Sequence, residues 1–139
     1  MNSRDGLLIR LDVPRIELMK KTYIDIIEFE LPIPTAVNAS YKTGSGNFYK
    51  SAEARAWEEE SLYKLMEQHV NQKPLLSGAL VVNLSFHFKK DRDIDSSIKI
   101  LLDLLQGRIY INDNQIQFLH VYKYKDIKDP RVEVRISTL

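Results

Sequence analysis

The segment from Lys89 to Lys99 carries the side chains whose types and spacing could do chemistry. Three aspartates stand there at alternate positions, Asp91, Asp93 and Asp95. In an extended backbone alternate side chains point to the same side, so this spacing gathers negative charge in one place. Such a cluster needs a positive partner, and carboxylate oxygens are the hard ligands that Mg²⁺ or Mn²⁺ prefer. The pattern therefore indicates a divalent-metal site.

The same aspartates could instead have a structural role. Asp93 or Asp95 could cap a helix, because aspartate accepts hydrogen bonds from the free N–H groups at a helix start. An EF-hand calcium loop is excluded, since Ser96 stands where that loop needs glycine and Leu102 where it needs a bidentate glutamate. The metal site and the helix cap both stay open.

Lys99 and Asp113 are the next candidates. Lys99 follows Asp95 by four residues, a spacing that places both on one face of a helix. It could form a simple ion pair, or it could stabilise charge on a phosphate under attack. Asp113 stands in Asn112-Asp113-Asn114, which is ordinary turn chemistry. It could also be a metal ligand, because a phosphodiesterase needs carboxylates from at least two segments to hold metal against the phosphate.

Composition limits the kind of protein. A chain of 139 residues fits one domain and can bury a core. It contains no cysteine, which excludes disulfides, thiolate metal sites and a cysteine nucleophile. No apolar run approaches the roughly 20 residues that a bilayer requires. We therefore expect a cytoplasmic protein with no membrane partner.

The net charge of +1 is low for a dedicated DNA-binding protein, but clustering matters more than the sum. Basic residues gather in two places, and each cluster is either a solvated turn or a phosphate-binding surface. The clusters are Lys89, Lys90 and Arg92, and then Lys123, Lys125, Lys128 and Arg131.

Hydrophobic patterning predicts an α+β fold: a single domain with a mixed or antiparallel sheet of about four to five strands and two main helices. Residues 80–88 alternate most clearly between apolar and polar side chains. Prolines end the first strand, and the Gly- and Asn-rich stretch that follows predicts a long loop. The expected strands are 23–31, 80–88, 115–125 and 131–136, the helices are 52–69 and 95–106, and the loop is 33–50.

Both helices carry sequence signals at their ends. Ser51 is suited to cap the first helix, and Gly107 is a natural stop for the second. The apolar residues of the first helix predict its buried face. These are Ala54, Trp57, Leu62, Leu65 and Met66.

Several separated segments together resemble the RusA-type Holliday junction resolvase family, over about residues 26–136. The resemblance is more specific than any single motif because the segments occur in order and at fitting spacing. The segments are Leu31-Pro32-Ile33-Pro34 with Asn38 and Tyr41, Ser51-Ala52-Glu53 with Trp57, Arg92-Asp93-Ile94-Asp95 with Lys99, and Asn112-Asp113-Asn114-Gln115-Ile116.

The resemblance implies a homodimer that binds four-way DNA junctions and nicks two strands symmetrically, in recombination and repair. It implies that Asp93, Asp95 and Asp113 bind Mg²⁺, with Mn²⁺ as a substitute and no small-molecule cofactor besides the metal. Lys99 would then assist catalysis. A RusA-like domain is expected over residues 22–139, preceded by an extension over 1–21, and a prophage origin would be typical of this family.

Candidate DNA contacts follow from the basic and aromatic residues near these segments. They are Lys89, Lys90, Arg92, Lys42 and Lys50 for phosphates, and Tyr41, Phe48 or Tyr49 for opened bases. The chain departs from the family at Ser96, where asparagine is common. Two alternatives therefore stay open: a junction-binding protein that has lost catalysis, and a protein in which a metal serves only to stabilise the structure or an interaction.

Overall fold

Strand β4 (Leu80–Phe88) lies in the interior of the sheet and alternates between buried and half-buried side chains along its whole length. The computed structural model describes residues 26–36, 41–44 and 47–139, and for residues 41–44 and 47–49 it describes the backbone alone. The bounds predicted for β4 are confirmed. Its fully or almost fully buried residues are Leu80, Val82, Leu84, Phe86 and Phe88.

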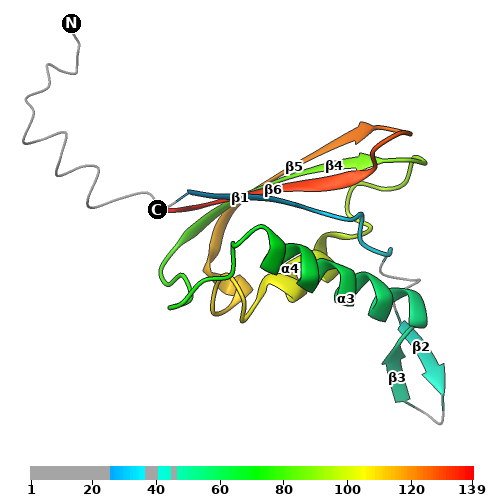
Figure 1. The fold of residues 1–139 in the computed structure, drawn as a ribbon, viewed down its shortest axis with the longest axis horizontal. Helices are drawn as coiled ribbons and strands as arrows, with labels where there is room; N and C mark the ends of the chain where they lie inside the picture. Colours follow the sequence, from blue (N-terminus) through cyan, green and yellow to red (C-terminus); the bar gives the residue numbers. More distant parts are fainter. Residues whose placement is uncertain (1–25, 37–40, 45–46) are drawn as a thin grey trace, which may run out of the picture.

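Four strands form a mixed sheet in the order β1-β6-β4-β5 (Figure 1). The strands that join β4 in it are β1 (Ile26–Leu31), β5 (Ile116–Lys125) and β6 (Arg131–Thr138). Strand β6 is antiparallel to both of its neighbours, whereas β4 and β5 are parallel. A parallel pair needs a crossover connection, and here the crossover contains the helix α4 (Ile98–Leu105). The predicted α+β fold with a mixed sheet is confirmed.

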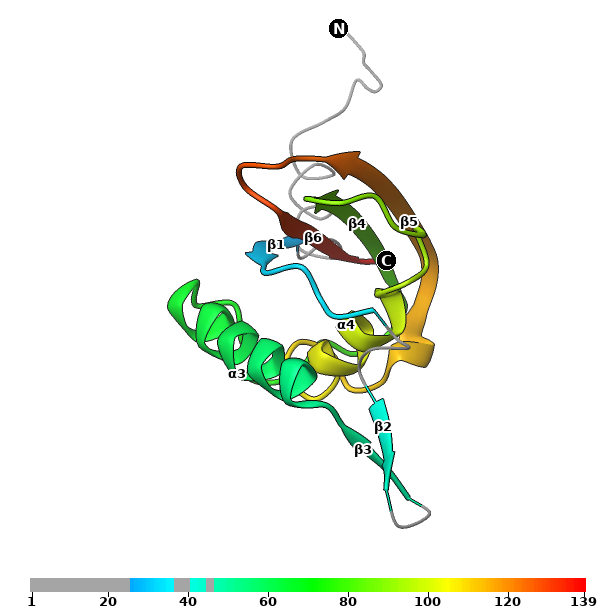
Figure 2. The same cartoon turned by 90° about the vertical axis from the view of Figure 1, so that its right-hand side faces the viewer.

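Helices α3 (Ala52–Glu67) and α4 lie on the same side of the sheet, as both views show (Figures 1 and 2). The core lies between these helices and the inner side chains of the strands. The other sheet face carries no helix among the described residues. Helix α4 contributes an almost continuous apolar surface to the core, with Ile100, Leu101, Leu102, Leu104 and Leu105 buried.

Helix α3 begins as the sequence predicts, because the Ser51 side chain accepts a hydrogen bond from the Ala54 N–H at 3.1 Å. It ends at Glu67, two residues early, and His69 has a left-handed φ of 58°. The prediction that Met66 is buried is wrong, since its side chain is 64% exposed. Successive helix positions are about 100° apart, so a stripe through Leu65 turns Met66 outward.

Residues 33–50 are not a continuous loop, which corrects the prediction. They contain a hairpin of β2 (Tyr41–Gly44) and β3 (Asn47–Lys50), with Tyr41 opposite Lys50 and Gly44 opposite Asn47. Glycine and asparagine mark hairpin turns as readily as loops, which is why the sequence alone misplaced this element. In both views the hairpin extends away from the sheet (Figures 1 and 2).

No helix within the described ranges is long and apolar enough to cross a membrane. The extension expected over residues 1–21 lies outside the described residues.

Candidate metal-binding active site

The loop between β4 and α4, residues 89–97, contacts the proline segment that follows β1 through the side chains of Arg92 and Ser97. The Arg92 guanidinium lies over the Phe88 ring, 4.6 Å from its centroid, and donates to the Pro34 carbonyl at 2.6 Å. The Ser97 hydroxyl lies 3.3 Å from the carbonyl oxygens of Pro34 and Thr35. These contacts hold the backbone on either side of Asp93 and Asp95.

The same contacts place the start of α4 later than the sequence predicts. The helix begins at Ile98 rather than near Asp95, and residues 94–97 form a turn. Asp95 therefore does not share a helical face with Lys99, and the extended spacing expected for the aspartates does not continue past Asp93. Both expectations assumed regular backbone where the chain is bent by long-range contacts.

Asp93 and Asp95 are both exposed. The residue at the helix start is Ser97, and its side chain makes no capping hydrogen bond. Neither aspartate side chain takes part in the hydrogen bonds or ion pairs found among the described residues. The helix-cap role is therefore unsupported for both, and their charge is available to a cation.

Asp91 has a different environment. The Lys123 ammonium lies 2.9 Å from an Asp91 carboxylate oxygen and also donates to the Arg92 carbonyl at 3.2 Å. The hydrogen bond from Lys123 and the charge behind it lower the pKa of Asp91. The first aspartate of the series is thus already neutralised by a lysine.

Asp113 begins a short 3₁₀ helix, η1 (Asp113–Gln115), as the turn chemistry predicts. Its backbone N–H donates to the Gln106 side-chain oxygen at 2.9 Å. The Gln115 amide closes the same turn, since its oxygen accepts the N–H groups of Ile111 and Asn112 at 2.9 and 2.8 Å. The side chains of Gln106 and Gln115 therefore fix the backbone at Asp113 and at the two residues before it.

Lys99 connects α4 to the second acidic segment. Its ammonium lies 2.9 Å from Asp103 and 4.0 Å from Asp113, while its side chain remains exposed. The carboxylate that shares a helical face with Lys99 is thus Asp103, four residues after it, rather than Asp95. A cation placed beside Asp113 and open to solvent can meet a phosphate.

Tyr110 is a buried residue that contacts α4 beside this region, and no pattern in the sequence had indicated a role for it. It is fully buried, and its hydroxyl donates to the Leu102 carbonyl at 2.7 Å. Burial, and after it the charges of Asp113 and Asp103, raise the pKa of Tyr110. The hydroxyl therefore stays protonated and serves as a fixed donor.

The donor set fits a hard divalent cation in its chemistry, because Asp93, Asp95 and Asp113 offer only carboxylate oxygens. Within the described ranges, however, no group of three acidic or histidine side chains is close enough together to hold a metal ion. The contact between Lys99 and Asp113 links the α4 segment to the η1 turn.

The candidate DNA-binding side chains differ in whether they already contact other residues of the protein. Lys89 and Lys90 are exposed at the start of the loop. Arg92 is engaged with Phe88 and Pro34, and the Lys50 ammonium lies 3.0 Å from Glu58.

The remaining candidates belong to the hairpin. The backbones of Tyr41 and Lys42 lie in β2, but their side chains are outside the described part of the chain. The same holds for the side chains of Phe48 and Tyr49 in β3.

Comparison with known proteins identifies a family for this chain. The family model described as Endodeoxyribonuclease RusA matches residues 31–137, most of the chain. The matched region contains Asp93, Asp95, Lys99 and Asp113. A search of curated proteins finds no match. Because the family match covers well over half of the sequence, the chain belongs to the RusA endodeoxyribonuclease family.

Proposed function

We propose that this protein is a metal-dependent endodeoxyribonuclease that resolves Holliday junctions by paired, symmetric nicks in DNA recombination and repair. The observation that carries the proposal is the family match over a region in which Lys99 joins the α4 segment to Asp113. The family supports nuclease activity, and the acidic side chains supply the means for it.

In this proposal Mg²⁺, for which Mn²⁺ can substitute, would draw together the side chains of Asp93, Asp95 and Asp113, which are not grouped closely enough to hold it in the described part of the chain. A bound ion of this kind lowers the pKa of a water and shields charge that develops on the phosphate. Asp93 and Asp95 are suited to the task because they are exposed and have no cationic partner among the described residues. Lys99 stabilises negative charge on the phosphate from the side of Asp113.

DNA is positioned by basic side chains around the loop. Lys89 and Lys90 can contact phosphates directly, since both are exposed beside the acidic segment. Lys50 is the last residue of the hairpin strand β3, and Lys42 and Tyr41 in β2 are further candidates. Arg92 is included in the same set, although its described contacts give it a second task, orienting the loop.

Paired nicks need two active sites related by a two-fold axis, so the proposal includes a homodimer. A cytoplasmic location and a prophage origin complete it. The prophage origin rests on the resemblance to the family, and the location on the DNA substrate.

The test is cleavage of a synthetic four-way junction with and without Mg²⁺. Asp95→Asn removes a ligand and a negative charge near DNA, so we expect cutting to fall at least about a hundredfold while junction binding is kept or strengthened. Asp91→Asn is the matched control, because Asp91 is already paired with Lys123. It should cut as the unchanged protein does. Normal cutting by Asp95→Asn would refute the role of Asp95.

A second function is favoured by one observation. The Ser96 hydroxyl is buried and makes no hydrogen bond among the described residues, at a position between Asp95 and Ser97. A loop backbone shifted at Ser96 from the position that catalysis requires would leave a protein that binds junctions without cutting them. Tight binding with no Mg²⁺-dependent nicks by the unchanged protein would select this function, and absence of binding would reject both.

A further inference from the structure

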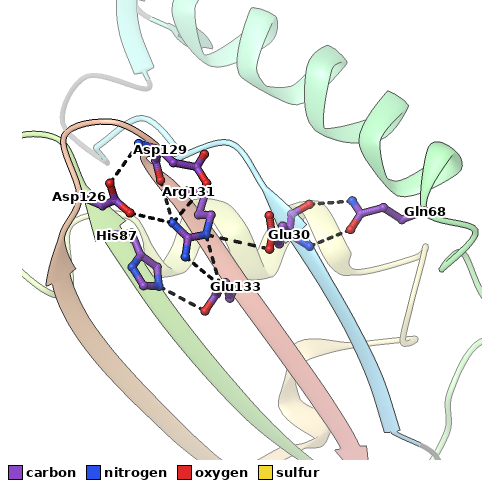
Figure 3. Close-up of polar contacts among 7 residues, drawn as sticks. All are labelled: Glu30, Gln68, His87, Asp126, Asp129, Arg131 and Glu133. Carbon is purple, nitrogen blue, oxygen red and sulfur yellow. Dashed lines mark hydrogen bonds and ion pairs between the residues drawn. The ribbon is translucent and has the colours of Figure 1, made fainter.

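The two edges of the sheet differ in how they are protected. At the β1 edge, the Gln68 side chain pairs with the backbone of Glu30 as a neighbouring strand would (Figure 3). The Glu30 N–H donates to the Gln68 amide oxygen at 2.9 Å, and the Gln68 amide nitrogen donates to the Glu30 carbonyl at 2.7 Å. The residue that follows α3 therefore occupies this edge.

The opposite edge is strand β5, which is ten residues long. Within the described part of the chain, no strand and no side-chain hydrogen bond covers its outer edge. A long unprotected edge offers a row of free N–H and C=O groups, and proteins usually shorten it, charge it or pair it.

The side chains on the open face of β5 are not the lysines or carboxylates that discourage another strand from pairing with an edge. The register with β4 places Phe118, His120, Tyr122 and Tyr124 opposite the half-buried residues of β4, on the face away from the helices. Phe118, Tyr122 and Tyr124 are all about half exposed. The two lysines of the strand alternate with them and lie on the helix-covered face. Of these, Lys123 is engaged with Asp91.

We propose that a second copy of this chain pairs with β5 in an antiparallel manner, so that two sheets join into one across a two-fold axis. The expectation of a dimer rests on the proposed function, whereas the choice of surface comes from the difference between the edges.

The sequence of β5 is complementary to itself in this arrangement. Opposed residues of an antiparallel pair point to the same face of the sheet, so a two-fold axis perpendicular to the sheet must pass between one residue and its own copy. At the middle of β5 that residue is His120 or Val121. Through either position, Phe118 lies opposite a tyrosine of the partner. Each lysine then faces glutamine or leucine, never another lysine. Aromatic pairs across strands are stabilising, and opposed like charges are absent.

Single cysteines test the surface directly, because the chain has none of its own. Residues on the axis lie about 4.5 to 5.5 Å from their own copies at Cα, a distance that a disulfide can span. Under oxidising conditions we expect His120→Cys or Val121→Cys to convert the full-length chain to a covalent dimer. Ile26→Cys, on the open face at the β1 edge, should stay monomeric on a non-reducing gel. Failure of both β5 variants, or equal cross-linking of Ile26→Cys, overturns the proposal.

A charge substitution provides the second measurement. Phe118→Glu places two carboxylates against the partner's aromatic residues, and we expect the dimer dissociation constant to rise about a hundredfold in sedimentation experiments. Ile26→Glu is the matched control, since Ile26 is 47% exposed and Phe118 55%. A dimer unchanged by Phe118→Glu contradicts the proposal. Cross-linking through β5 in a protein without nuclease activity would refute only the proposed function. Junction cutting by a protein that forms no β5 cross-links would refute only the proposed dimer surface.

Discussion

At the scale of single residues, Gln106 determines where Asp113 lies. Gln106 is the residue directly after the last turn of α4, and its side-chain oxygen accepts the Asp113 N–H. The end of the helix and the start of η1 are thereby tied together. Gln106 acts through Asp113 and is a positioning residue, since its described role is to fix the backbone of a proposed ligand.

Gln106→Leu should lower junction cutting about ten- to a hundredfold, the usual effect of losing a residue that orients a metal ligand. Leucine has a similar size but no acceptor, so the Asp113 N–H loses its partner. We expect junction binding to persist and the Mn²⁺ concentration needed for half-maximal cutting to rise. Gln72→Leu is the control, because among the residues that the structure describes the Gln72 side chain donates only to the nearby Val70 carbonyl. Unchanged cutting and unchanged metal dependence would contradict this role.

The sequence identified the acidic residues but not their partners. Asp93 and Asp95 were recognisable as candidates from residue type and spacing, and Asp113 from its combination with them. The partner of Lys99 was not, because it depends on where α4 begins. That start depends on contacts between Ser97 and the carbonyls of Pro34 and Thr35, more than sixty residues earlier in the chain.

At the scale of elements, the connection between β5 and β6 is organised by Asp126. One of its carboxylate oxygens accepts the N–H groups of Lys128 and Asp129 at 3.2 and 3.1 Å. The other accepts from the Arg131 guanidinium at 3.1 Å, and Arg131 also contacts Glu133 (Figure 3). The Asp129 backbone hydrogen bond, and then the bond from Arg131, lower the pKa of Asp126.

This lowered pKa predicts how stability depends on pH. The contribution of Asp126 is complete above its unfolded-state pKa of about 3.9 and is lost as the pH falls through the lower folded-state pKa. Asp126→Asn keeps an acceptor for the backbone but has no charge to lose. The urea midpoint of the variant should therefore fall less between pH 6 and pH 3 than that of the unchanged protein. The exposed α3 substitution Glu59→Gln should leave the pH dependence unaltered, and an equal acid loss in Asp126→Asn would refute the assignment.

Elements with one regular buried face were predictable, and elements set by distant contacts were not. The alternation in β4 and the apolar run in α4 follow from local sequence. The β2–β3 hairpin was interpreted as a loop because its glycine and asparagine residues fit both. Met66 was misplaced because a helix with few large apolar residues leaves its buried stripe poorly defined.

At the scale of the whole molecule, the sequence predicted the fold class but not the strand order. Which strands become edges is decided by pairings between residues far apart, such as β1 with β6. For the described residues, the unequal protection of the two edges and the coverage of one face by helices emerge only from the assembled sheet. The same holds for the candidate active site, whose two acidic segments precede and follow α4 in the sequence and are linked by the contact between Lys99 and Asp113.

The claim on which the proposed function depends is that these two segments share one divalent cation. A crystal structure of the protein soaked in Mn²⁺, with the ion located by its anomalous scattering, measures this directly. We predict an ion bound by Asp113 together with Asp93 or Asp95, and by water for its remaining ligands. An ion held by one segment alone, or no ion near these carboxylates at saturating Mn²⁺, would contradict the shared site.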